Sequence, residues 1–461
     1  MSPFRFAGFS QFFKNRDFYT RLFALAIPAM IQNLIGALVN ILDTIMIGRL
    51  GTVEIAAVGL GGQVFFLFNS LIFGIGTGGG IFIAQFWGKG DVKGIRKNMG
   101  FCLILGILSG LLFTLGSALF PRTIIGIFSR DPEVIELGAV YLRGLFPMFI
   151  PFAIAGIFAI ALRSIEKIRL SMIASIIAIF VNLILNYVFI FGFGPVPAMG
   201  VMGAAAATVI ARICEMLILV IASHVRRYAV VGSFREYFSF SPGFIRNFLI
   251  TIIPLICNRM IWSLAVSIQN FIFARLHTDA IAAFNIINTI SMLAWAVFMG
   301  LGNGAAVLVG KSIGEGNEEK ARDYALRIVI FAPLVACFFT LLFLALPPVL
   351  PFIFNVSPRA LAFSGVMLAI LAISFPARAF NTALVISVCQ AGGDTLFCAI
   401  FDLVFMWFVS LPAALLAGFV FGSPVWLVYL IITAEDFMKM LFLGIWRFKS
   451  GKWLHNLVKN L

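Results

Sequence analysis

The chain is poor in charged residues. Only 11% of its 461 residues are Asp, Glu, Lys or Arg, whereas 62% are hydrophobic. A soluble protein carries about 25% charged residues. The apolar residues come in blocks of roughly 20, the length with which a helix crosses a bilayer. This composition excludes a water-soluble globular protein and predicts an all-α integral membrane protein.

Residues that carry enzyme chemistry are also scarce. The sequence has three histidines, no HExxH or GxSxG motif, and no P-loop. Its six cysteines form no CxxC pair, so we interpret them as small packing residues. A membrane-embedded enzyme is therefore not favoured, and we expect neither a cofactor nor a structural metal. A channel is not favoured either, because no polar stripe runs through several spans.

About twelve apolar blocks are candidate membrane spans. They lie near 22–47, 55–86, 98–120, 138–161, 169–192, 201–222, 246–274, 280–310, 325–346, 361–388, 396–420 and 424–446. The segment 1–21 mixes Phe with Arg and Lys and lacks a cleavage site after an apolar stretch. We interpret it as an amphipathic segment on the membrane surface.

The net charge of +14 is unevenly distributed along the chain. Alternate inter-span segments, for example 89–97 and 223–245, are rich in Lys and Arg, and we count Lys439 with this side. The remaining loops carry only Arg49, Arg122, Arg130, Arg275 and Arg359. Under the positive-inside rule this bias predicts that both termini are cytoplasmic, in a plasma (cell inner) membrane. The basic charge is thus a topology signal and does not indicate nucleic-acid binding.

The two halves of the chain are related by an internal repeat. A shift of 226 positions pairs Pro28 with Pro254. The same shift pairs Arg49 with Arg275, Thr52 with Thr278, Gly76 with Gly302, Gly90 with Gly316, and Pro132 with Pro358. Each half holds six spans and therefore has the same orientation. The sequence predicts two pseudo-symmetric six-helix lobes, 22–222 and 246–446, joined by a cytoplasmic linker, 223–245, and followed by a basic tail, 447–461.

Segments along nearly the whole chain resemble the multidrug and toxic compound extrusion (MATE) family. They include PAMIQNLIGALVNILDTIMIGRLG in the first span, VNLILNYVFIFG in the fifth, and AIAAFNIINTISMLAWAVFMGLGNGAAVLVGKSIGEGN in the second half. The resemblance implies a two-lobed secondary transporter. It would couple H⁺ or Na⁺ entry to the export of bulky, often cationic or amphipathic compounds.

The resemblance assigns the coupling role to Asp43, the acidic residue of an LxNxxDT-like pattern, which is also a possible Na⁺ ligand. The shift of 226 places Gln269, which does not titrate, at the equivalent position. Some relatives carry a second acidic residue where this chain has Asn186. We predict a polar N-lobe cluster around Asp43, formed by Asn40, Asn182, Asn186 and Thr208; interhelical polar packing is the alternative for the asparagines.

The second half carries charges deep in predicted spans. Arg259 and Arg378 each lie about 15–18 Å from a helix end, too far for easy snorkelling. The candidate partners are Asp402, Glu435 and Asp436. Two interpretations stay open: ion pairs that brace this lobe, or a cationic patch that binds an anionic or zwitterionic substrate.

Taken together, these patterns predict a secondary active multidrug antiporter that works by alternating access. Its partners would be small-molecule substrates and the lipid bilayer, and we expect a monomer. The nearest alternative is a flippase or exporter of lipid-linked or anionic substrates.

Overall fold

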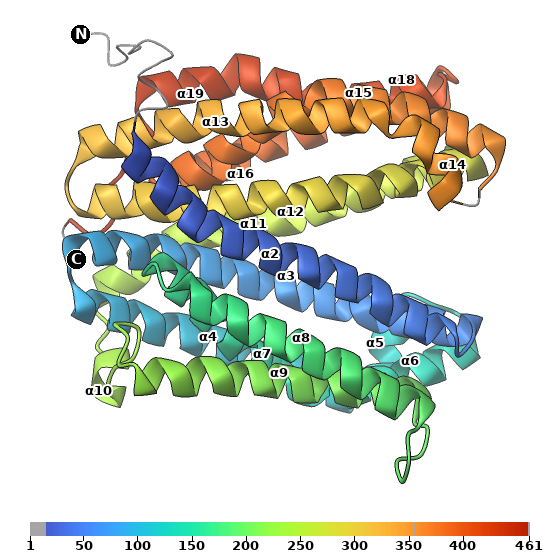
Figure 1. The fold of residues 1–461 in the computed structure, drawn as a ribbon, viewed down its shortest axis with the longest axis horizontal. Helices are drawn as coiled ribbons and strands as arrows, with labels where there is room; N and C mark the ends of the chain where they lie inside the picture. Colours follow the sequence, from blue (N-terminus) through green and yellow to red (C-terminus); the bar gives the residue numbers. More distant parts are fainter. Residues whose placement is uncertain (1–14, 355, 460–461) are drawn as a thin grey trace. The chain divides into compact units, whose positions relative to one another are not determined.

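The computed structural model describes residues 15–354 and 356–459, which are mainly helical (Figure 1). The side chains of Asn40, Ile41 and Leu443 lie outside the described part. Residues 1–14 of the predicted amphipathic segment also lie outside it, and α2 begins at Arg16. The helices of the first half are α2 (Arg16–Gly48), α3 (Thr52–Lys89), α4 (Val92–Leu119), α5 (Pro121–Gly126), α6 (Pro132–Leu145), α7 (Phe149–Ser164), α8 (Ile168–Phe191), α9 (Gly200–Val225) and α10 (Phe234–Tyr237).

The second half continues with further α-helices and several π-helical segments. They are α11 (Pro242–Leu276), α12 (Thr278–Gly314), α13 (Glu318–Ala345), α14 (Leu350–Ile353), α15 (Pro358–Thr382), η3 (Ala383–Gln390), α16 (Thr395–Leu403), η4 (Val404–Ser410), α17 (Leu411–Leu415), η5 (Leu416–Val420), α18 (Val425–Met438), η6 (Lys439–Gly444) and α19 (Ile445–Ser450). Two short 3₁₀ turns, η1 (Phe146–Met148) and η2 (Pro347–Val349), complete the described elements.

The internal repeat is visible in the starts of the helices. Helices α2, α3, α4 and α6 each begin 226 positions before α11, α12, α13 and α15 respectively. The turn before α4 ends in Gly90, with φ 76°, and the equivalent turn ends in Gly316, with φ 74°. These left-handed conformations suit glycine. The N-caps that follow, Asp91 and Asn317, each accept a hydrogen bond from the backbone three residues on. The predicted pseudo-symmetry is confirmed.

Eleven of the described helical segments are long and apolar enough to cross a membrane. The twelfth predicted span, 424–446, coincides with α18, η6 and the start of α19. This segment carries Glu435, Asp436 and Lys439, and a π-helical stretch interrupts it. The charged residues and the π-helical interruption explain why this segment is not counted among the eleven apolar helices that are long enough to cross a membrane. The segment is nevertheless helical along most of its length.

The chain divides into two compact units. The N-unit comprises residues 31–252, and the C-unit joins the part of α2 up to Met30 to residues 253–460. In the N-unit α8 packs on α9, and α3 packs against α4, α6 and α7. In the C-unit α12, α13 and α15 pack together, and α15 also packs on α18. The predicted lobe limits, 22–222 and 246–446, stay a prediction.

Both changes of unit occur inside a helix and beside a proline. The boundary in α2 follows Met30, close to Pro28, and the boundary in α11 precedes Ile253, next to Pro254. These are the two prolines that the repeat pairs. A proline inside a helix removes one backbone hydrogen bond and loosens the helix there. A proline thus lies beside each of the two positions at which the chain passes from one unit to the other.

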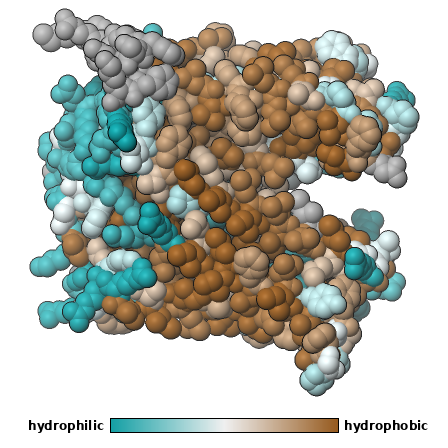
Figure 2. All heavy atoms as spheres, viewed as in Figure 1, coloured by the Kyte–Doolittle hydropathy of each residue, from teal (hydrophilic) through white to brown (hydrophobic). Residues whose placement is uncertain are grey.

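The sides of the helices carry an apolar surface, and hydrophilic residues gather at the helix ends (Figure 2). Large side chains are highly exposed on this surface, for example Leu112 at 68% and Phe338 at 66%. Exposure of this extent in a folded protein is normal only where another apolar medium covers the surface. The surface is therefore the one expected for contact with lipid chains.

The linker 223–245 docks on α4 within the N-unit. Ser233 and Glu236 form a reciprocal cap at the start of α10, and Glu236 also accepts a hydrogen bond from the Arg96 guanidinium at 2.7 Å. The Tyr237 carbonyl lies so close to Gly100 that any side chain there would collide with it. Hydrogen bonds to the Glu236 carboxylate hold its pKa below its ordinary 4.5. The bond from the Ser233 N–H has the larger effect, and the bond from the Arg96 guanidinium follows.

We expect Glu236→Gln to loosen this linker, because both the cap and the ion pair need the carboxylate. Hydrogen–deuterium exchange at residues 228–240 should rise several-fold at neutral pH. Since the folded-state pKa is lowered, the stabilisation is present above about pH 4.5 and disappears as pH falls through the lowered value. The exposed neighbour Arg235→Gln is the matched control. Equal exchange in the two variants would contradict the docking role of Glu236.

Candidate functional site

The predicted polar residues of the N-unit meet around Asp43. The Asn186 amide donates to the Asp43 carboxylate at 2.8 Å and lies 3.3 Å from the side-chain oxygen of Asn182. Asn182 in turn donates to the Thr208 hydroxyl at 3.4 Å. These four residues, the Asp43 cluster, come from α2, α8 and α9. The structure therefore brings together Asp43, Asn182, Asn186 and Thr208 as the sequence grouped them.

Helix periodicity explains this meeting. Asn182 and Asn186 are four apart and so share one face of α8, which packs along α9. The Thr208 hydroxyl donates a hydrogen bond to the Ala204 carbonyl at 2.9 Å, and this bond fixes the orientation of the Thr208 side chain. Asn40 lies on α2 one turn before Asp43, but its side chain is outside the described part, so its place in the cluster stays a prediction.

The surroundings of Asp43 are polar and partly enclosed. Asp43 is half-buried, Asn186 is only 2% exposed, and among the described residues the Asn186 Oδ1 atom has no hydrogen-bond partner. The buried Tyr141 of α6 and Arg212 of α9 lie within electrostatic reach of the Asp43 carboxylate. An acceptor oxygen without a donor beside a carboxylate is a site where a small cation or a protonated group fits.

The charged residues predicted for the second half also meet, within the C-unit. Asp402 accepts from Asn258 at 3.0 Å and from the Lys439 ammonium at 3.0 Å. Lys439 also pairs with Glu435 at 2.9 Å, and its residue exposure is only 6%. One lysine thus bridges two carboxylates, one on α16 and one on α18.

A second ion pair involves Asp436, the residue that follows Glu435 on α18. The Arg378 guanidinium of α15 donates to Asp436 at 2.9 Å, and Asn381 donates to the Asp436 backbone carbonyl at 2.8 Å. Arg259 lies within electrostatic reach of Asp402. The C-unit charge cluster therefore contains three cations and three carboxylates, which are Arg259, Arg378, Lys439, Asp402, Glu435 and Asp436. Its charges balance, which is the arrangement that a structural brace requires.

Comparison with known proteins shows the same duplication. A family model described as MatE matches residues 28–188 and matches again over residues 254–416. The chain belongs to the MatE family. The two matches begin at Pro28 and Pro254, the prolines that the shift of 226 pairs, so the model detects each half separately.

Relatives span nearly the whole MatE chain. A probable multidrug resistance protein, NorM of Thermotoga maritima, is 27% identical over 452 residues, which is 94% of this chain and 92% of the relative. An uncharacterized transporter, YisQ of Bacillus subtilis, is 23% identical over 439 residues, or 94% of each chain. A crystal structure of MATE in complex with MaL6 has a TM-score of 0.85 at 22% identity, covering 94% of this chain and 96% of that one. The predicted MATE-like fold is confirmed, and the chain is a membrane transporter of the MatE family.

The sequence interpretation missed a second polar group in this MatE transporter. Glu215 accepts from Arg212 at 2.7 Å and from Ser175 at 2.5 Å, and Ser175 accepts from Gln32 at 2.7 Å. We call these four residues the Glu215 cluster. The available signal was the pair of ionisable residues, three apart, inside the sixth predicted span. Charges at that depth need compensation and by default mark function.

From the sequence, we counted Lys439 with the basic inner segments and named no carboxylate partner for it. Lys439 opens the π-helical segment η6, and its ammonium lies between Asp402 and Glu435. The spacing of four from Glu435 is a helical ion-pair spacing and could have indicated this. Asp402 likewise lies just before the π-helical segment η4. Such wide turns are frequent at functional sites because they redirect side chains.

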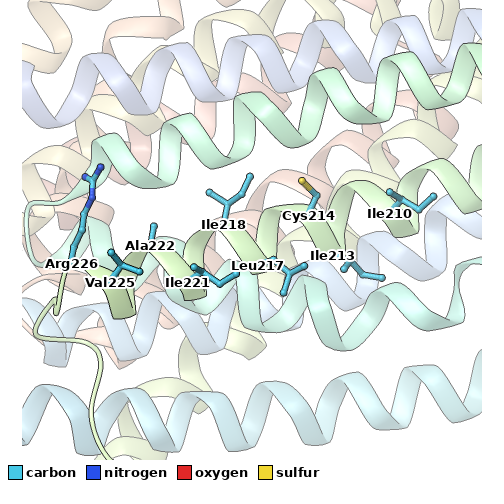
Figure 3. Close-up of a pocket in the computed structure, with 9 residues that line it drawn as sticks. All are labelled: Ile210, Ile213, Cys214, Leu217, Ile218, Ile221, Ala222, Val225 and Arg226. Carbon is cyan, nitrogen blue, oxygen red and sulfur yellow. The ribbon is translucent and has the colours of Figure 1, made fainter.

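The surface of α9 also carries an open groove of about 670 Å³, drawn in Figure 3. Its lining is apolar from Ile210 to Val225, with Arg226 at one end. Ile221 lies nine residues after Arg212, or two and a half turns at about 3.6 residues per turn, and so faces the opposite side of α9. The residues that line the groove do not include a member of the Asp43 cluster or of the Glu215 cluster.

Proposed function

We propose that this MatE transporter exports small molecules, often cationic or amphipathic, in exchange for inward movement of H⁺ or Na⁺. Asp43 binds the coupling ion, and its occupancy changes as the site opens alternately to the two sides of the membrane. The observation that supports this most is the half-buried Asp43 carboxylate, held at 2.8 Å by Asn186, whose own Oδ1 atom lacks a donor among the described residues.

The internal repeat supports one coupling site, at Asp43, because the second half has no acidic residue at the equivalent position. The position equivalent to Asp43 is Gln269, which is 8% exposed and cannot change its charge. The acid that some relatives carry at the Asn186 position is also absent. One carboxylate therefore remains in the Asp43 cluster, so one monovalent ion suffices to neutralise it.

The available energy is sufficient for concentrative export. One charge that falls through about 100 mV releases about 2.3 kcal/mol. A tenfold ion gradient adds about 1.4 kcal/mol, and the sum of about 3.7 kcal/mol sustains a substrate gradient of a few hundredfold. We place the transporter in the plasma membrane as a monomer, with both termini cytoplasmic and without a cofactor.

Dye-loaded proteoliposomes that contain the purified full-length chain test this proposal. A pH step and a sodium step are applied separately, and efflux of a cationic dye is followed by fluorescence. We expect one of the two steps to accelerate efflux, whereas protein-free liposomes respond to neither. Efflux that is insensitive to both steps would contradict ion-coupled export.

A second candidate function is a flippase or exporter of anionic or lipid-linked substrates. Arg259 and Arg378 favour it, because guanidinium groups bind phosphates and carboxylates well. The ion pair between Arg378 and Asp436 weakens it, since that guanidinium already has a carboxylate partner at 2.9 Å. A matched anionic dye in the same liposomes distinguishes the two candidates: faster ion-driven efflux of the anion would favour the second.

A further inference from the structure

The Glu215 cluster lies on the same helix faces as the Asp43 cluster. Ser175 is seven residues before Asn182 on α8, which is about two turns. Glu215 is seven residues after Thr208 on the antiparallel helix α9, and Gln32 is about three turns before Asp43 on α2. The N-unit therefore holds two polar layers, about two turns apart, on three shared helices.

Arg212 lies between these two layers. It is one turn after Thr208, its guanidinium pairs with Glu215 at 2.7 Å, and it is within electrostatic reach of Asp43. The guanidinium also lies over the Phe152 ring, 5.4 Å from its centre. Among the described residues its Nε atom has no hydrogen-bond partner. Arg212 can therefore contribute its charge to either carboxylate.

The charges of this group do not balance. Asp43 and Glu215 contribute two negative charges when ionised, and Arg212 contributes one permanent positive charge. The other groups that face Asp43 are Asn186 on α8 and Tyr141 on α6, and both are neutral near pH 7. The set therefore lacks one positive charge. An uncompensated charge at this depth is costly, so the site favours the binding of one monovalent cation.

We propose that the Arg212–Glu215 ion pair sets the affinity of Asp43 for the coupling ion, with Arg212 as a positioning residue that Glu215 holds away from Asp43. The inference rests on the proposed function, because it takes Asp43 as the ion-binding carboxylate. Glu215 draws the guanidinium charge to itself and so leaves Asp43 able to attract a cation. Without Glu215, Arg212 would neutralise Asp43 and compete with the ion.

The proposal makes opposite predictions for the two partners of one ion pair. Arg212→Gln leaves two carboxylates without a counter-charge, so the coupling ion should bind more tightly. Glu215→Gln frees Arg212 to pair with Asp43, so the ion should bind more weakly. At an effective dielectric of about 20, a unit charge about 12 Å away changes the affinity about tenfold, and a closer charge changes it more. If protons drive transport, this equals a shift of about one pH unit in the midpoint of activity.

The measurement is the half-saturating concentration of whichever ion drives dye efflux from proteoliposomes. We expect it to fall about tenfold in Arg212→Gln and to rise about tenfold in Glu215→Gln. The double variant Arg212→Gln/Glu215→Gln restores a net charge of minus one and should return to the wild-type value. Arg212→Lys keeps the charge and should also stay near wild type. The exposed pair of Arg122 and Glu136 provides the control Arg122→Gln, for which no change is expected.

A charge exchange tests the proposal if a single variant fails to fold. Arg212→Glu/Glu215→Arg keeps the ion pair but moves a negative charge nearer to Asp43, so the ion should bind more tightly. A purely structural ion pair would tolerate this exchange with an unchanged half-saturating concentration, and that result would overturn the inference. Shifts of the two single variants in the same direction, or none, would also overturn it. If Asp43→Asn transports with unaltered coupling, the proposed function itself fails.

Discussion

We expect Asp43→Asn to abolish ion-driven efflux while leaving the protein folded. The amide has the same shape as the carboxylate, and its oxygen still accepts the hydrogen bond from Asn186, which the wild-type residue accepts at 2.8 Å. It cannot take up a proton or balance the charge of Na⁺. The variant should therefore equilibrate a dye but not concentrate it, and a gradient of a few hundredfold should collapse to none, a loss of about 3.7 kcal/mol of coupling.

The same substitution near the start of the same helix is the matched control. Asp17 forms an exposed ion pair with Arg21, four residues on, and its side chain is 59% exposed. Exposed pairs contribute at most about 1 kcal/mol, so Asp17→Asn should transport as the wild type does. Dye efflux from proteoliposomes under a pH or sodium step measures both variants. Undiminished concentrative transport by Asp43→Asn would refute the coupling role.

Lys439→Met is expected to destabilise the C-unit strongly. The substitution keeps a long unbranched side chain, one atom shorter than lysine, but leaves Asp402 and Glu435 without the ammonium that contacts them at 3.0 and 2.9 Å. Removal of one partner from a buried ion pair costs about 3–5 kcal/mol, because the remaining charge stays buried without compensation. Thermal unfolding of the purified protein in detergent should therefore begin at a markedly lower temperature.

Neutralisation of one carboxylate, Glu435, should reverse much of this loss. The double variant Lys439→Met/Glu435→Gln removes one cation and one carboxylate, so the charges of the cluster stay balanced, and neutral replacements of buried ion pairs are often tolerated. The exposed Lys452→Met serves as the control and should unfold like the wild type. If Lys439→Met were as stable as this control but lost transport, the cluster would belong to the translocation pathway and would not be a brace.

Much of the candidate site is predictable from the sequence because it follows from local rules. Asp43 stands out as a carboxylate inside an apolar span, and a charge at that depth has few explanations other than function. The spacing of four between Asn182 and Asn186 already places them on one helix face. The repeat likewise identifies Gln269 as a position without charge, which leaves the two halves chemically unequal.

The ion-pair partners of the charged residues were harder to predict from the sequence. In the sequence, Lys439 is one of many basic residues counted with the predicted inner side. Its spacing from Glu435 is local, but its contact with Asp402 of α16, 37 positions away, is evident only from the fold. Arg212 and Glu215 lie in a span that otherwise resembles ordinary lipid-facing sequence. Ser175 is 40 positions away from Glu215, and Arg378 is 58 positions away from Asp436. No local pattern specifies such contacts.

The sequence alone predicted about twelve apolar spans, showed that the two halves of the chain are related by a repeat, and placed one acidic residue inside the first span. These properties depend on the length of apolar runs and on the order of residues, both of which are local. The tertiary structure decided which charges neutralise one another and that Arg212 is placed between two carboxylates. Such pairing depends on how each helix is rotated about its axis and which neighbour it packs against, and only the folded chain sets both.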